Sequence, residues 1–221
     1  MYQFEVIGNK KIEINYDGTT ICLFLDNELY TILVNGPHQV AENFFYINYK
    51  SNKKKFNDLE EIKFKLDELS LLKIKSFLGN FESGKYYVCQ LNGKLDFIEN
   101  KENNISDLYF SNESNRIIIY TNSSNSLNRE IINNYKTKII NGESPIIFLY
   151  SKTYSGAELE NIFFIIYGNE ILKAYQELNI PPKFISIVNY SEADYEVSNQ
   201  NVLKIISSHK QIKETSYKYF Y

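Results

Sequence analysis

Short apolar runs separated by turn residues dominate the first 35 positions of the chain. Asp17-Gly18 between two of these runs suits a type I′ hairpin turn, because both central residues of that turn need a positive φ angle. Since the runs recur about every nine residues, we predict a four-stranded antiparallel meander. The run 20–25 is nearly all apolar, which predicts a central strand. The predicted strands cover residues 2–7, 11–16, 20–25 and 29–34.

A long helix is predicted after this meander. Asn57 or Asp58 can cap its start, and Glu60 and Glu61 then fall in the first turn, where acidic residues favour the helix dipole. Apolar residues follow at helical spacing until Gly79-Asn80, which we expect to end the helix. Further strands are predicted at residues 44–49, 85–91, 95–99, 107–110 and 116–121, with Asn92-Gly93 as a hairpin turn and a short helix from Ser126 to Tyr135.

The last third of the chain changes character. Residues 145–150 form a continuous apolar run, as expected of a strand that is buried on both faces. A long helix is predicted over 156–178 with an interruption at Gly168, then a strand over 184–188 and a helix over 197–213.

We therefore predict an α+β protein. Its N-terminal antiparallel β-meander carries one long helix, and further antiparallel strands and a C-terminal β-α-β-α layer follow. The predicted lobes are residues 1–143 and 144–221, packed as one globular unit.

Composition argues against a usual catalytic apparatus. The chain has two arginines, Arg116 and Arg129, and two histidines, His38 and His209. Arginine is the preferred clamp for phosphate and carboxylate, and histidine is the usual proton shuttle and a common metal ligand. With only Cys22 and Cys89 present, we expect neither a disulfide framework nor a zinc site, and no cofactor. A net charge of −3 speaks against nucleic acid as a partner.

Aromatic residues are abundant, with 19 tyrosines and 15 phenylalanines, and they gather at the C-terminal end of the sequence. Because aromatic clusters often mark interfaces, we expect protein contacts there, through Tyr217, Tyr219, Phe220 and Tyr221. The leading hypothesis is a non-enzymatic protein-binding or assembly module, such as an accessory subunit of a bacterial or mobile-element system, with a protein partner or a homo-oligomer. No apolar run approaches the roughly 20 residues of a membrane span and Met1 to Glu5 carries no signal-peptide pattern, so we expect a cytoplasmic protein.

The alternative hypothesis is an enzyme, or a degenerate enzyme, with a site near His38, Cys22 and Asp17. Cys22 or Cys89 would be the nucleophile, with His38 as its base. The segment 15–21, Asn-Tyr-Asp-Gly-Thr-Thr-Ile, resembles the first phosphate loop of the actin, sugar-kinase and Hsp70 superfamily. That family has an Asp two residues before the Gly, and Tyr16 stands at this place here, so the plain hairpin reading is preferred.

Two further resemblances belong to this alternative. Residues 84–87 and 164–189 are similar to late elements of flavin-dependent nitroreductases, which implies a flavin-binding α/β fold, although the arginines by which that family holds the flavin phosphate have no counterpart in the first 115 residues. Residues 78–120 resemble the sheet of the glutaminase domain of asparagine synthetases. That resemblance implies an amino-terminal Cys nucleophile, but residue 2 is Tyr2, so the usual catalytic residue would be lacking.

Overall fold

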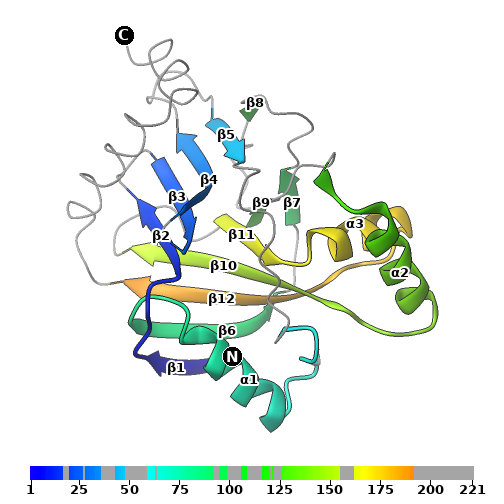
Figure 1. Ribbon diagram of the computed structural model, residues 1–221, viewed down its shortest axis with the longest axis horizontal. Helices are drawn as coiled ribbons and strands as arrows, with labels where there is room; N and C mark the ends of the chain where they lie inside the picture. The colour runs from blue at the N-terminus through cyan, green and yellow to red at the C-terminus, as the bar shows by residue number, and fades with distance from the viewer. Residues whose placement is uncertain are drawn as a thin grey trace.

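The computed structural model describes twelve strands and three helices, arranged as two sheets with helices beside them (Figure 1). The chain is thus a mixed α+β protein, as the sequence predicts. The described residues are 1–16, 20–26, 28–35, 43–47, 59–62, 64–91, 95–98, 106–108, 116–119, 121, 126–154 and 162–191. Several predictions, including the helix over 197–213, fall outside them.

The smaller sheet contains the predicted meander. Its order is β2-β3-β4-β5-β8 and every neighbouring pair is antiparallel. In β2 the residues alternate, with Ile12 and Ile14 buried, whereas β3 is buried at every residue from Ile21 to Leu25, as expected of a central strand. The five strands are β2 (Ile12–Tyr16), β3 (Thr20–Leu25), β4 (Glu28–Asn35), β5 (Asn43–Ile47) and β8 (Ser106–Leu108).

The first predicted strand does not belong to this meander. β1 (Tyr2–Val6) instead pairs with β6 (Gly84–Leu91) in the larger sheet. The chain crosses between the sheets where residues 8–12 lie against residues 79–81, with Lys10 N donating to Phe81 O at 3.0 Å and Ile12 N donating to Asn80 O at 2.8 Å. Gly8 makes this approach possible, because a Cβ at this position would lie 1.8 Å from Phe81 O.

The larger sheet is mixed, with the order β1-β6-β12-β10-β11-β9-β7. β10 and β12 are parallel over their whole length, as the buried runs in the last third predict, and β9 is parallel to both β11 and β7. The predicted hairpin at Asn92-Gly93 is wrong, because β6 and β7 lie far apart in this order. The remaining bounds are β12 (Lys183–Ser191), β10 (Ile146–Tyr154), β11 (Ile162–Tyr167), β9 (Arg116–Ile119) and β7 (Leu95–Ile98).

The long helix predicted over 156–178 is also wrong in its first part. Residues 162–167, Ile-Phe-Phe-Ile-Ile-Tyr, form β11, and α3 (Asn169–Glu177) begins after Gly168. Phe163 to Ile166 are buried on both faces of the sheet, and such a run has no periodicity that separates strand from helix. Gly168 makes the turn with a φ of 101°, which a residue with a side chain rarely adopts.

The other two helices begin later than predicted. α1 (Glu68–Leu78) starts where the Asp67 carboxylate accepts a hydrogen bond from Ser70 N at 2.8 Å, and it ends at Gly79 as expected. Residues 59–62 form a separate turn whose Leu59 and Ile62 are buried. α2 (Arg129–Ile140) is capped by Asn128 and continues past the predicted end at Tyr135.

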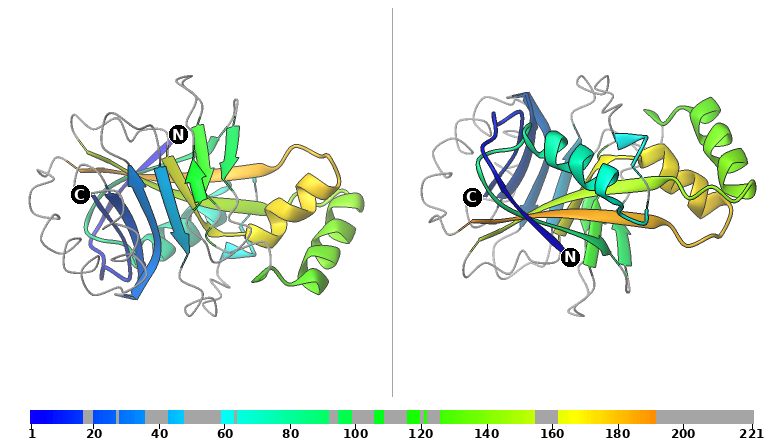
Figure 2. Two further views of the ribbon diagram at one scale, coloured as in Figure 1. Left: turned by 90° about the horizontal axis from the view of Figure 1, so that it is seen from above. Right: turned by 90° about the horizontal axis from the view of Figure 1, so that it is seen from below.

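Alternate residues of the larger sheet enter two apolar clusters. Phe148 and Tyr150 of β10 pack with β2, β3 and α1, whereas Ile147 and Leu149 pack in a cluster that includes α2 and α3. The smaller sheet lies steeply across one face of the larger sheet, and α2 and α3 lie together at one end of the molecule (Figure 2). The division into lobes at residue 143 stays a prediction, although the larger sheet joins strands from both sides of it.

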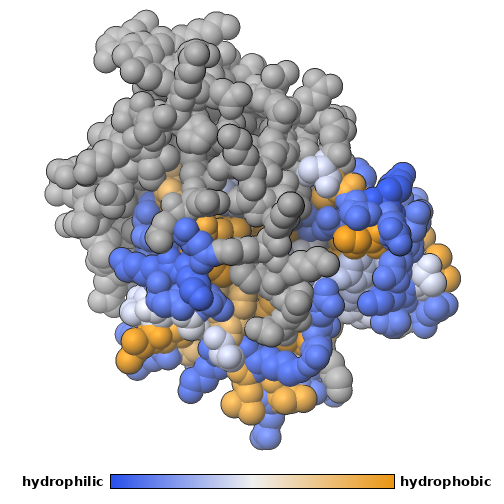
Figure 3. All heavy atoms as spheres, viewed as in Figure 1, coloured by the Kyte–Doolittle hydropathy of each residue, from blue (hydrophilic) through white to orange (hydrophobic). Residues whose placement is uncertain are grey.

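Two observations concern the outside of the molecule. None of the helices in the described ranges is long and apolar enough to cross a bilayer. Exposed apolar side chains include Leu69 and Leu72 on α1, and the space-filling view shows an apolar patch over this helix (Figure 3).

Candidate binding cleft

The sequence-predicted site residues mostly fall outside the described part of the chain. His38, Asp17 and the aromatic residues Tyr217, Tyr219, Phe220 and Tyr221 all do, so these remain predictions. Cys22 lies in the middle of β3 and is fully buried, in agreement with a structural role. Cys89 is half-buried, with its Sγ 3.1 Å from Ser186 Oγ on β12.

A cleft of about 350 Å³ opens between residues 59–62 and 64 on one side and the helices α2 and α3 on the other. Its lining is about as polar as it is apolar, and the apolar part includes Leu59, Ile62, Phe64, Ile146 and Ile171. Its polar groups are Tyr135, Tyr167, Lys138 and Ser144 together with three carboxylates, those of Glu60, Glu61 and Glu143. Because polar groups converge there beside apolar side chains, we treat this cleft as the candidate binding site.

Two tyrosine hydroxyls meet at this cleft. The hydroxyl oxygens of Tyr135 and Tyr167 are 3.2 Å apart. Tyr135 lies on α2 between the buried residues Ile132 and Ile139, which are three positions before it and four after it. Tyr167 is the last residue of β11, and its ring lies edge-on to Phe148 with the ring centroids 6.2 Å apart. A helix and a strand therefore fix the two hydroxyls relative to each other.

The environment keeps both tyrosines protonated. Burial raises the pKa of Tyr135, and the charge of Glu60 raises it further. Burial also raises the pKa of Tyr167, with smaller contributions from Tyr135 and from a hydrogen bond with Glu60. At neutral pH the pair therefore offers hydrogen-bond donors and acceptors, and neither tyrosine supplies a phenolate base.

Carboxylates outnumber cations among the described residues that line the cleft. Lys138 is the cation, and its ammonium lies over the ring of Tyr135, 5.2 Å from the ring centroid. Glu61 is paired with Lys73 of α1. The negative charge of Glu60 raises the pKa values of both tyrosines. The carboxylates and the tyrosine oxygens together make the polar end of the cleft rich in hydrogen-bond acceptors.

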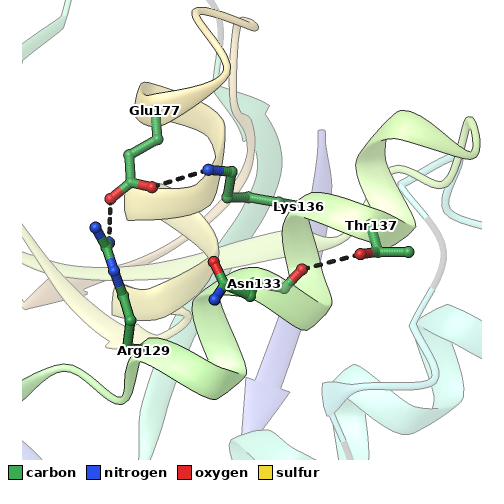
Figure 4. Close-up of polar contacts among 5 residues, drawn as sticks. All are labelled: Arg129, Asn133, Lys136, Thr137 and Glu177. Atoms are coloured by element: carbon green, nitrogen blue, oxygen red, sulfur yellow. Dashed lines mark hydrogen bonds and ion pairs between the residues drawn. The ribbon is translucent and has the colours of Figure 1, made fainter.

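An ion-pair network holds α2 against α3 and thereby positions Tyr135. The Glu177 carboxylate on α3 accepts hydrogen bonds from Arg129 and from Lys136 of α2, the second at 3.1 Å (Figure 4). Lys136 directly follows Tyr135, so this contact is adjacent to the cleft.

The start of α3 is anchored by a buried amide. Asn169 Oδ1 accepts from Thr121 N at 3.1 Å, and its Nδ2 donates to Thr121 Oγ1 at 3.0 Å. The same threonine hydroxyl donates to Ile165 O of β11. These bonds fix the turn around Gly168, and with it the direction of Tyr167.

A cluster of polar side chains is also buried beneath the smaller sheet. Lys152 Nζ of β10 lies 2.7 Å from Glu82 Oε1, and Asn189 Nδ2 of β12 donates to the same oxygen at 3.1 Å. Asn189 also donates to the hydroxyl of Tyr86, which in turn donates to Glu82 O at 2.8 Å. Because these groups satisfy one another, we interpret the cluster as a structural one.

Sequence reasoning did not identify the cleft. Tyr135 and Tyr167 are two of 19 tyrosines and lie in separate elements, so no local motif marks them. Within the described ranges, His, Cys, Asp and Glu side chains form no group of three that could hold a metal ion. Comparisons with models of known protein families, with curated proteins and with solved structures gave no match.

Proposed function

We propose that the protein is a non-enzymatic protein-binding module, and that the cleft between residues 59–62 and 64, α2 and α3 receives a side chain of its partner. The observation that carries this proposal is the pair of protonated tyrosine hydroxyls, 3.2 Å apart, at a cleft lined by both apolar and polar side chains. Tyrosine is enriched at interfaces because it combines a large apolar ring with a hydrogen-bonding hydroxyl. An accessory subunit of a larger assembly would use such a site.

The size of the cleft supports a side chain as its occupant. Its volume of about 350 Å³ lies at the lower end of the range that holds small molecules. A protein partner can place one side chain there and make the remaining contacts on the surrounding surface. The partner then supplies most of the interface, which for a stable complex buries more than about 1,000 Å².

The polar groups favour a cationic side chain on an apolar stem, such as lysine or arginine. Among the described lining residues, Glu60 and Glu143 stand against Lys138, and Glu61 is paired with Lys73 of α1. Either hydroxyl of the tyrosine pair can donate to the other, and the oxygen of the donating hydroxyl keeps lone pairs that can accept from a ligand. A methylene stem would pack on Ile62 and Ile146, while its charged end meets these acceptors.

Photo-cross-linking in cells that produce the protein tests this proposal. Ser144, at the rim of the cleft, is replaced by p-benzoylphenylalanine, and a matched control carries the same residue in place of the exposed Lys75 on α1. We expect a discrete adduct with one partner from position 144 and none from position 75. Glu60→Gln should lower the adduct yield from position 144. No adduct at position 144, or equal labelling from both positions, would refute the proposal.

The purified protein also separates this proposal from the enzyme alternative. A visible absorption band from a bound flavin, released on unfolding, would favour the resemblance to nitroreductases over a binding module.

A further inference from the structure

One edge of the larger sheet is formed by β1, which pairs with β6 on one side. Among the described residues, no strand pairs with β1 on its other side. Such an edge presents a row of backbone N–H and C=O groups that can template pairing with another strand. Many natural edges are protected by lysine, proline or a β-bulge. The sequence of β1, Tyr-Gln-Phe-Glu-Val, has neither of these residues, and its register with β6 is regular throughout.

The sequence of β1 is complementary to itself. In an antiparallel pair centred on Phe4, each Gln3 stands opposite a Glu5, and each Tyr2 opposite a Val6. Gln3 and Glu5 are both exposed, so the amide of one copy can donate to the carboxylate of the other. A pair centred on Glu5 would instead place two carboxylates directly opposite each other, which is destabilising. The charges thus disfavour the register centred on Glu5, and the Gln3–Glu5 hydrogen bonds favour the one centred on Phe4.

An apolar patch lies beside the same edge. α1 lies next to β1, and both occupy the lower end of the molecule in Figure 1 and the side nearest the viewer in the right-hand view of Figure 2. α1 buries Ile74, Phe77 and Leu78 against the core. Leu69 and Leu72, three positions apart on the helix, are 60% and 65% exposed.

We propose that two copies of this chain associate through their β1 strands, antiparallel and centred on Phe4, and form one continuous sheet across both copies. The two-fold axis of such a pair runs perpendicular to the sheet, so both α1 helices lie on the same face, one on each side of the seam. In this arrangement we place the exposed Leu69 and Leu72 of each copy against the other copy, because two paired strands alone are only marginally stable in water. The occupant of the edge and of the patch is therefore a second copy.

The test measures the molar mass of the full chain by light scattering and its dimer dissociation constant by sedimentation. We expect twice the 26.0 kDa of one chain at high concentration and dissociation on dilution. Gln3→Glu places a carboxylate opposite Glu5 twice per dimer, so the dissociation constant should rise about tenfold. Gln3→Lys, at the same exposed position, should lower it. Adding Glu5→Lys to Gln3→Glu places a lysine opposite each new carboxylate, so the dissociation constant should fall to about that of Gln3→Lys.

The helix patch is tested separately. Leu72→Glu should raise the dissociation constant, whereas Lys75→Ala, an exposed control on the same helix, should not. Unchanged thermal midpoints verify that these surface variants fold. If the protein is still monomeric at about 100 µM, the dimer dissociation constant is higher than that of most specific complexes, and the proposal is overturned. A dimer whose dissociation constant does not respond to the substitutions at Gln3 and Glu5 would overturn it as well.

Discussion

The buried ion pair between Lys152 and Glu82 gives the sharpest stability prediction. The two side chains are 7% and 14% exposed, and their charged atoms are 2.7 Å apart. Lys152→Met keeps the volume of the stem but removes the ammonium, so that Glu82 retains the Asn189 amide at 3.1 Å as a remaining donor. The variant therefore leaves a carboxylate with a large part of its compensating charge missing.

The expected cost follows from this arrangement. Breaking a buried pair by removing one partner costs 3–5 kcal/mol in general, and the slight exposure of Glu82 favours the lower end, about 3 kcal/mol. Glu82→Gln should cost about 2 kcal/mol, because an amide oxygen can still accept from Lys152. The double variant, Lys152→Met with Glu82→Gln, retains neither charge, so it should cost about 3 kcal/mol. The two single variants together would cost about 5 kcal/mol, and the difference is a coupling energy of about 2 kcal/mol.

Urea unfolding at neutral pH measures all four free energies of unfolding. The midpoints should move while the slope stays constant, since the substitutions do not change the surface that unfolding exposes. Lys136→Met is the matched control, because Lys136 pairs with Glu177 but keeps 30% of its side chain exposed, and its cost should stay below about 1 kcal/mol. Additive effects at Lys152 and Glu82, or a cost for Lys152→Met as small as that of the control, would refute the reasoning.

Two further predictions concern pH. Hydrogen bonding from Arg129, with Lys136 beside it, lowers the pKa of Glu177. Ionised Glu177 therefore stabilises the folded protein at pH values above the ordinary carboxyl pKa. This stabilisation is lost as the pH falls through the lowered pKa of the folded state. Glu177→Gln should lower the free energy of unfolding by about 1 kcal/mol at neutral pH and leave it unchanged in strong acid. Urea unfolding at both pH values measures this, and a loss that does not depend on pH would contradict the prediction. Burial raises the pKa of Tyr30 and Tyr175 from 10.0 to about 12. Their stabilisation is therefore complete below pH 10.0 and is lost as pH rises towards about 12, and Tyr175→Phe should flatten the fall of the thermal midpoint in this range. An equally steep fall in the variant would count against it.

Local sequence patterns predicted where the strands lie better than which strands pair with one another in the sheets. The alternation of Ile12 and Ile14 and the apolar runs of β3, β10 and β12 identified strands correctly, because each pattern reflects which faces of a strand are buried. The position of β1 was not predictable in the same way. Its turn at Gly8-Asn9 looks like the other turns, and only the close approach of Gly8 to Phe81 shows that the chain changes sheets there. That contact joins residues more than 70 positions apart.

Helix boundaries were missed where tertiary contacts decided them. The apolar spacing from Leu59 to Phe77 fits one helix, but Leu59 and Ile62 are buried through a turn, and the cap at Asp67 starts α1 only at Glu68. A capping residue is visible in the sequence, yet Asn57, Asp58 and Asp67 are all acceptable caps by residue type. The choice between them depends on which apolar residues the larger sheet can bury.

The cleft illustrates a stricter limit of sequence reasoning. Its tyrosine hydroxyls are brought together by the packing of α2 on α3 and by the turn at Gly168, neither of which leaves a motif at Tyr135 or Tyr167. The scarcity of arginine and histidine argues against sites that need a guanidinium clamp or a proton shuttle, but it does not locate a binding surface. The residues that a search by reactivity selects, such as Cys22, are buried in the sheet. A protein that recognises partners by shape needs common residues in particular places, and for such a site the fold has to be known first.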